Sequence, residues 1–237
     1  DACDGGDLEM FAVNGAHRMT EAQVRFVGLQ MVALLTYLHN TSCLYRDLKP
    51  ENVLLDSAGQ CRLVDFGTAK LSKKVGAKQP PASSELCGSR PFMAPEVEAI
   101  GKLMDDGRDD EVMPYSSACD WFSLGVTLYV LAEKAYPFGL HPAYEDVSTE
   151  FVQPTLLADD RVTEVAHLYD LLTGLLDWDP LNRFGGDAER IEALRAHPYW
   201  LDADWELADA GLMPSPLRQF AEQQSEHSTD QRKRDEV

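Results

Sequence analysis

The chain has 237 residues, and its 21 Lys and Arg stand against 40 Asp and Glu, which gives a formal net charge of −19. Hydrophobic residues make up 44% of it, an ordinary fraction for a globular protein and too high for a disordered one. Phosphate repels a net anion, so this charge argues against a general nucleic-acid binder. We expect a globular protein that binds no nucleic acid, and the charge is compatible with basic partners.

The five cysteines form no C-x-x-C pair. Their low, odd number predicts reduced thiols in an intracellular, cytoplasmic setting, without a disulfide framework or a zinc site. The longest nearly apolar stretches, 26–38 and 121–132, are shorter than the roughly 20 residues that cross a bilayer. No signal segment opens the chain, and residue 1 is Asp, so we expect a processed product or a fragment.

The first predicted element is an amphipathic helix over 20–39. Thr20 and Gln23 have the spacing of a capping box, in which each side chain satisfies a free backbone N–H of the first turn. Apolar residues then recur at helical spacing: Val24, Val27, Met31, Leu34, Leu35 and Leu38.

Short β-rich runs follow between 43 and 66, where Asp56-Ser57-Ala58-Gly59 has the composition of a hairpin turn. Residues 70–90 carry Lys, Ser, Pro and Gly without periodicity, which predicts a long loop. Residues 101–114 are expected to form an acidic, Gly-containing insertion, in which 105–111 is a solvated loop.

Further helices are predicted in the second half of the chain. The first covers 118–133, with Ser117 as its cap and Asp120 at its third position. The next covers 162–177, and Asp187 is expected to cap another helix that runs to about 196. The expected fold is therefore mainly α with short β-hairpins. The polar residues 216–237 are expected to form a flexible tail.

The clearest chemistry lies in YRDLKPEN (45–52) and DFG (65–67). Asn52 and Asp65 offer the hard oxygen ligands that Mg²⁺ prefers when it also binds phosphate. Asp47 can accept a proton from an incoming hydroxyl, and Lys49 can neutralise charge on a moving phosphoryl group. We expect the side chains of Asp47, Asn52 and Asp65 to converge on one cleft that seats a magnesium-bound triphosphate.

These two segments and Ala94-Pro95-Glu96 resemble, in order, the catalytic loop, the metal-binding triplet and the end of the activation segment of eukaryotic protein kinases. The resemblance implies that Asp47 is the catalytic base and that Lys49 steadies the γ-phosphate of ATP. It implies that Asn52 and Asp65 bind Mg²⁺.

Two further residues resemble the structural charges of this family. Asp120, before Trp121, is similar to the central-helix aspartate that holds the backbone of the catalytic loop. Arg183 is similar to the arginine that pairs with the glutamate of the activation-segment triplet, here Glu96. The resemblance covers about residues 1–215 and implies the hinge and C-terminal lobe of a kinase domain, truncated at its N-terminus.

The subfamily signatures are Tyr45 in place of His, GGDL (5–8), CGS (87–89) and HPYW…DW (197–205). They resemble the AGC group of serine/threonine kinases. The wording DFGTAK is also similar to the phosphoinositide-dependent kinase branch, and the choice between branches stays open.

Other roles follow from the same resemblance. The backbone from Asp1 to Cys3 matches the hinge that bonds adenine, Leu54 matches the residue beneath adenine, and Asp7 can bond the ribose. Asp7 and Glu51 match acidic positions that hold an arginine upstream of the phospho-acceptor. Protein substrates with basic residues near that acceptor are therefore expected.

Glu85 occupies the place where AGC kinases commonly carry a phosphorylatable threonine. A carboxylate has less charge than a phosphate but can pair with Arg46 and Lys70. We hypothesise an activation loop whose ordering is partly independent of phosphorylation, with a solvated glutamate as the alternative. Ser89 matches the hydroxyl that contacts the catalytic Asp and Lys.

No G-x-G-x-x-G sequence, which clamps phosphates from the N-terminal lobe of a kinase, occurs in the chain. We therefore expect the isolated chain to bind nucleotide weakly and to transfer phosphate negligibly. Two other classes stay open: a truncated kinase-like scaffold or decoy, and an acidic binding module unrelated to kinases.

Overall fold

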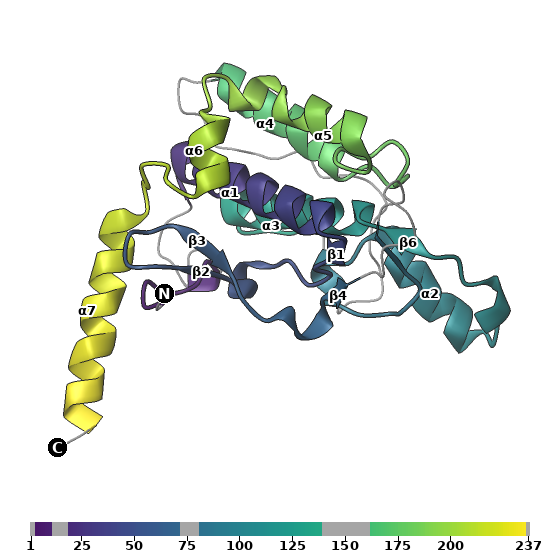
Figure 1. Cartoon of the computed structure of the whole chain (residues 1–237), viewed down its shortest axis with the longest axis horizontal. Coiled ribbons are helices and arrows are strands. Elements are labelled where there is room, and N and C mark those ends of the chain that lie inside the picture. The colour runs from purple at the N-terminus through teal and green to yellow at the C-terminus, as the bar shows by residue number, and fades with distance from the viewer. Residues whose placement is uncertain (1–2, 11–18, 72–80, 139–161, 236–237) are drawn as a thin grey trace.

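The computed structural model describes residues 3–10, 19–71, 81–138 and 162–235. Helices α1 (Glu21–Asn40) and α3 (Ala118–Glu133) pack together at the centre of the molecule, as Figure 1 shows. Around them lie α2 (Pro95–Asp105), α4 (Val162–Leu175), α5 (Ala188–Arg195), α6 (Trp205–Ala210) and α7 (Arg218–Asp235). The mainly helical architecture agrees with the expected fold class. None of the helices in these described ranges combines the length and apolar character needed to span a bilayer.

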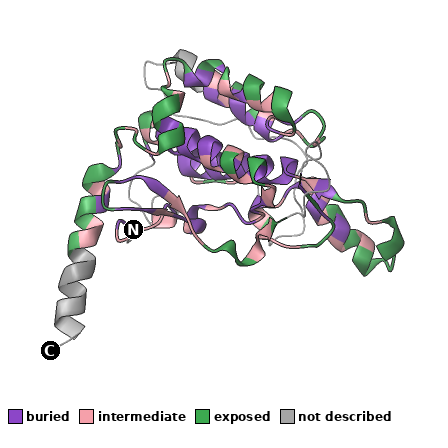
Figure 2. Ribbon diagram, viewed as in Figure 1, coloured by how far each residue is buried: buried purple, intermediate pink, exposed green. Residues whose placement is uncertain are grey.

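Helix α3 is buried along all 16 of its residues, because it is apolar on every side (Figure 2). Its N-terminus differs from the prediction. Ser117 already has helical backbone angles (φ −57°, ψ −13°) and makes no side-chain cap. The helix begins after Ser117 as predicted, but the side-chain cap is absent, and the preceding Ser116 hydroxyl accepts the N–H of Ala118 at 3.3 Å.

Two other caps are confirmed. In α1 the Thr20 N–H donates to Gln23 Oε1 at 2.9 Å, and the Gln23 N–H donates to Thr20 Oγ1 at 3.4 Å. In α5 the Asp187 carboxylate accepts the Arg190 N–H at 2.9 Å. These contacts join residues three positions apart, so local spacing is enough to predict them.

The strands of the described residues form antiparallel pairs. They are β1 (Cys43–Leu44) with β4 (Lys70–Leu71), β2 (Val53–Leu55) with β3 (Cys61–Leu63), and β5 (Ala82–Ser83) with β6 (Tyr115–Ser116). The predicted hairpin turn is confirmed between β2 and β3, where Asp56 Oδ1 accepts the N–H groups of Ala58 and Gln60, each at 2.9 Å. Strands β4 and β5 fall in the predicted loop 70–90, whose residues 72–80 lie outside the described ranges. The loop prediction was wrong at these strands, because each pairs with a distant segment.

The N-terminal segment 3–10 pairs with β2. The Gly5 N–H donates to the Leu55 carbonyl at 3.0 Å, and the Leu8 N–H donates to the Val53 carbonyl at 3.0 Å. The β2–β3 hairpin is held from its other side by the C-terminal part of the chain, where the Ser215 hydroxyl donates to the Gly59 carbonyl at 2.7 Å.

Two acidic or polar segments differ from their predictions. The loop expected over 105–111 is exposed, but Asp105 is still the last residue of α2 and Asp109–Glu111 form a short 3-10 helix (Figure 2). The polar tail is helical in the structure, as α7. Its first turns are anchored because Leu217 and Ala221 are fully buried, a tertiary contact that composition does not reveal.

Candidate active site

Asp47 is the centre of the predicted catalytic loop. Its Oδ1 accepts the Ser89 N–H at 2.9 Å, and its Oδ2 lies 3.1 Å from Lys49 Nζ. The Asn52 amide nitrogen donates to the Asp47 carbonyl at 2.8 Å and to Oδ2 at 3.0 Å. Lys49 also donates to the Ser89 hydroxyl at 2.7 Å. The structure thus brings these four predicted residues together.

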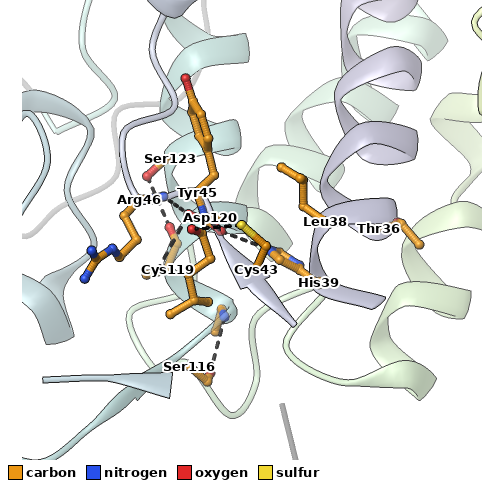
Figure 3. Close-up of polar contacts among 12 residues, drawn as sticks. Thr36, Leu38, His39, Cys43, Tyr45, Arg46, Ser116, Cys119, Asp120 and Ser123 are labelled. Carbon is orange, nitrogen blue, oxygen red and sulfur yellow. Dashed lines mark hydrogen bonds and ion pairs between the residues drawn. The ribbon is translucent and has the colours of Figure 1, made fainter. Parts of the chain in front are cut away.

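The backbone of this loop is fixed by Asp120, which is fully buried on α3 (Figure 3). Asp120 Oδ2 accepts the Tyr45 N–H at 2.9 Å and Oδ1 accepts the Arg46 N–H at 2.7 Å. His39, at the end of α1, lies 2.8 Å from Oδ2. Arg46 has a φ of 71°, a left-handed conformation that costs a non-glycine residue energy, and the carboxylate holds it there.

Asp65 follows the second strand of the hairpin. The Val64 N–H donates to the Asn52 carbonyl at 3.1 Å, which places Asp65 one residue beyond a direct contact with Asn52. Asp65 is exposed and its Oδ1 accepts the Gly67 N–H at 3.1 Å. Burial, and then the charges of Asp47 and Asp65, raise the pKa of Tyr45, whose ring lies 5.3 Å from that of Phe66, the residue after Asp65.

The donor set of Asn52 and Asp65 fits Mg²⁺. The Asn52 amide nitrogen points at Asp47, which leaves the amide oxygen on the other side of the group. Among the described residues there is no cluster of three or more His, Cys, Asp or Glu side chains that could hold a metal. A site with few protein ligands suits Mg²⁺, which usually keeps waters and binds one or two carboxylates together with substrate phosphates.

The predicted adenine side lies along β2. Asp7 forms an isolated antiparallel bridge with Leu54, and its Oδ1 accepts the Met10 N–H at 3.1 Å. Cys3 is half-buried in the same segment, whereas Asp1 lies outside the described residues. The structure therefore brings Asp7 and Leu54 together.

Glu9 is a residue of this region that sequence reasoning missed. Burial, and then the charges of Glu51 and Asp7, raise the pKa of Glu9. Burial, and then the charges of Glu51 and Glu9, likewise raise the pKa of Tyr136. The charges of Asp7 and Glu51 thus both act on the Glu9 carboxylate, and we name these three residues the acidic cluster. Asp7 and Glu51 were already paired in the sequence analysis, and the signal for Glu9 was its close spacing to Asp7.

Glu85 joins two basic side chains of the activation segment region. Its carboxylate lies 3.0 Å from Arg46 Nη1 and 2.8 Å from Lys70 Nζ, which lowers the pKa of Glu85 through the hydrogen bonds from Lys70 and then Arg46. Arg46 and Lys70 also donate to the buried Ser83 hydroxyl, at 2.9 and 3.3 Å. The structure shows both contacts that the sequence analysis expected for Glu85.

Tyr115 on β6 was not predicted to take part. Its hydroxyl donates to the Glu85 carbonyl at 2.8 Å and accepts from Arg46 Nη1 at 3.3 Å. Burial raises the pKa of Tyr115 to about 12, so the phenol stays neutral and can donate. No local pattern in the sequence joins Tyr115 to Glu85, because they are 30 residues apart.

Known proteins similar to this chain are of the kind that this geometry indicates. The family model described as the protein kinase domain matches residues 1–200. Ribosomal protein S6 kinase alpha-4 of Homo sapiens is 36% identical over 201 residues, which are 84% of this chain and 24% of that protein. Two proteins of Drosophila melanogaster are each 30% identical over 91% of this chain. They are the protein kinase C eye isozyme, of which 28% is covered, and the RAC serine/threonine-protein kinase, of which 32% is covered.

The chain therefore belongs to the eukaryotic protein kinase family. Within that family it is of the AGC serine/threonine type, as the subfamily signatures predicted. The chain spans between 24% and 32% of the length of these three relatives.

Proposed function

We propose that the protein is an ATP- and Mg²⁺-dependent kinase that phosphorylates serine or threonine in protein substrates, with its catalytic domain covering 1–215 of this chain. The observation that carries the proposal is the set of contacts around Asp47. Its carboxylate is held by Asn52, Lys49 and the Ser89 N–H at 2.9–3.1 Å. A carboxylate fixed in this way is a prepared acceptor for a hydroxyl proton.

Each side chain has one task in the proposed reaction. Asp47 orients the substrate hydroxyl and accepts its proton, while Lys49 places positive charge where the transferring phosphoryl group passes. Asn52 and Asp65 would hold Mg²⁺, which neutralises phosphate charge when bound. Cys3, Leu54 and Asp7 would line the nucleotide, with the hinge backbone from Asp1 onward at the adenine edge.

The acidic cluster supports a preference for basic substrates. Glu9 and Glu51 are close enough for each to raise the pKa of Tyr136, and Asp7 lies in the same field. Bringing like charges together is unfavourable until a cation arrives, so an arginine of the substrate would relieve their repulsion. The net charge of −19 is consistent with basic partners. The free thiols of the cysteines support an intracellular, cytoplasmic location.

We also propose that Glu85 takes part in ordering the activation segment. It pairs with Arg46, whose backbone belongs to the catalytic loop, and with Lys70 on β4. This arrangement needs no added phosphate. Because no G-x-G-x-x-G occurs among the 237 residues, we expect phosphate transfer by these residues alone to be slow.

The test is a phosphate-transfer assay on the complete parent protein with Mg²⁺, ATP and a serine peptide that carries arginines. Asp47→Asn is expected to lower kcat by about 100-fold or more, as expected when a general base is lost. Asp202→Asn is the matched control, because Asp202 is exposed and its left-handed backbone also suits Asn. Its activity should equal that of the wild type.

A second measurement separates binding from chemistry. Asp65→Asn should weaken binding of Mn²⁺, used in place of Mg²⁺, in the presence of ATP, while Asp47→Asn should leave ATP binding almost unchanged. Retained turnover in Asp47→Asn would exclude the proposed base. A wild-type protein that binds Mg²⁺ and ATP but transfers no phosphate would instead favour the scaffold alternative.

A further inference from the structure

A groove of about 700 Å³ lies between α2, the segment 111–116 and the segment 180–190, which ends in the first turn of α5. It is outside the proposed catalytic centre. Its α2 wall is formed by Glu96, Ala99, Ile100 and Leu103. Their spacing of three and four residues places them on one face of the helix. This part of the molecule lies at the end opposite α7 (Figure 1).

The groove has an apolar floor and an apolar mouth. Ile100 and Tyr115 are buried, whereas Met113 is 77% exposed and Leu181 is 74% exposed. A single exposed apolar side chain is ordinary on a protein surface. Two of them beside one apolar hollow mark a surface on which another molecule can bury apolar area.

The surface next to the groove is acidic. The end of α2 and the segment that follows it carry exposed carboxylates that form no ion pair with another described residue: Asp105, Asp106, Asp109 and Asp110. Two other carboxylates are different, because Arg108 is bonded to Glu111 at 2.6 Å and Arg190 is bonded to Asp187. Uncompensated negative charge attracts Lys and Arg of a partner and repels acidic segments.

We propose that this groove binds a short segment of a partner protein in which leucine-like side chains are flanked by lysine or arginine. The apolar side chains would enter between Met113 and Leu181, and the basic ones would lie over the four uncompensated carboxylates. A volume of about 700 Å³ is within the range of pockets that bury a drug-sized ligand, which leaves room for apolar side chains of a bound segment.

The groove also borders the activation segment. Tyr115 lines the groove, and its hydroxyl donates to the Glu85 carbonyl at 2.8 Å. Strand β6, which contains Tyr115, also pairs with β5, which lies just before Glu85 in the chain. A bound segment would therefore lie against residues that support Glu85. This proposal does not depend on phosphate transfer by the chain.

The test uses the whole 237-residue chain and a fluorescein-labelled peptide, Lys-Arg-Leu-Lys-Leu-Arg-Lys, which has no residue that can be phosphorylated. Fluorescence anisotropy at low salt measures its Kd. The double variant Met113→Ser, Leu181→Ser should weaken binding about tenfold. Each substitution removes part of the apolar surface that the bound peptide would bury, and the free energy of that burial is lost. Folding should be intact because both residues are exposed.

The matched control is Leu201→Ser, Leu212→Ser, which removes apolar side chains that are 71% and 68% exposed elsewhere. It should bind the peptide like the wild type. Replacing the four carboxylates with Asn should also weaken binding at low salt, and this difference should disappear at high salt. A peptide with asparagine in place of both leucines should bind at least about tenfold more weakly.

Several outcomes would overturn the proposal. One is no binding of the leucine peptide at low salt, and another is unchanged binding by the groove variant. A third is loss of binding in Glu51→Gln alone, which would place the peptide at the acidic cluster. A fourth is self-association of the chain in sedimentation velocity that the groove variant abolishes, which would make a second copy the occupant.

Discussion

Arg183 and Glu96 form a two-bond ion pair that ties the loop before α5 to the start of α2. Arg183 Nη1 lies 2.6 Å from Glu96 Oε1, and Nη2 lies 3.0 Å from Oε2. The arginine side chain is fully buried, and it also donates to the carbonyls of Asp177 and Ala118, each at 2.9 Å. One planar guanidinium thus joins three segments.

We expect Arg183→Lys to lower the free energy of unfolding by about 3 kcal/mol, because a lysine cannot form the two parallel bonds and leaves buried acceptors unpaired. Urea denaturation followed by circular dichroism measures the change. The control is Arg190→Lys, which alters an exposed pair with Asp187 and should have a much smaller effect. If the two variants lower the free energy of unfolding equally, the buried pair stabilises the fold no more than the exposed pair does.

The second prediction concerns the activation segment. Glu85→Gln keeps the size of the side chain but removes the charge that pairs with Arg46 and Lys70. We expect faster hydrogen exchange at the backbone amides of 82–86, and lower activity of the complete protein, because this segment then loses its two ion pairs. Ser84→Ala changes an exposed neighbour and should exchange like the wild type. Exchange that is the same in Glu85→Gln and in the wild type would mean that the glutamate is only solvated.

The third prediction is a pH dependence at Glu9. Its pKa in the folded protein is raised above 4.5, by burial and by the neighbouring carboxylates. Its ionisation therefore destabilises the folded state, and this cost appears as the pH rises through and above 4.5. Glu9→Gln should match the wild type in Tm below that pH and exceed it at neutral pH.

The control for Glu9 is Glu192→Gln, at an exposed position in the middle of α5. It removes one carboxylate outside the acidic cluster, so it should not reproduce the gain in Tm expected for Glu9→Gln. Glu9→Gln should also weaken binding of an arginine-containing substrate peptide to the parent protein, since the acidic cluster then has less charge. If the Tm difference between Glu9→Gln and the wild type is constant with pH, the neighbouring carboxylates do not raise the pKa of Glu9 as stated.

The parts of the site that could be predicted from the sequence are those with short spacing. Asp47, Lys49 and Asn52 lie within one loop, so their order in the chain already limits their separation. The cap of α1 and the β2–β3 turn are of the same kind, because their partners are a few residues apart. These features depend on local geometry alone.

The rest depends on contacts that no local pattern contains. Strand β5 exists because β6 lies beside it, and Tyr115 reaches Glu85 only through that pairing. The pKa of Glu9 is raised in part by the charge of Glu51, which is far from it in the sequence. The polar residues of α7 form a helix whose first turns are anchored by Leu217 and Ala221, although composition alone indicated a tail.

Asp120 has one more consequence, which concerns the entropy of ligand binding. Its contacts join the backbone N–H groups of Tyr45 and Arg46 and the His39 side chain at the end of α1 to the buried helix α3. The loop is thus already in shape before nucleotide or substrate arrives. The free energy of ligand binding is therefore not reduced by the entropy cost of ordering this backbone, which would be roughly 1–2 kcal/mol for each residue ordered. More of the affinity for a substrate can then be used to hold the reacting groups together.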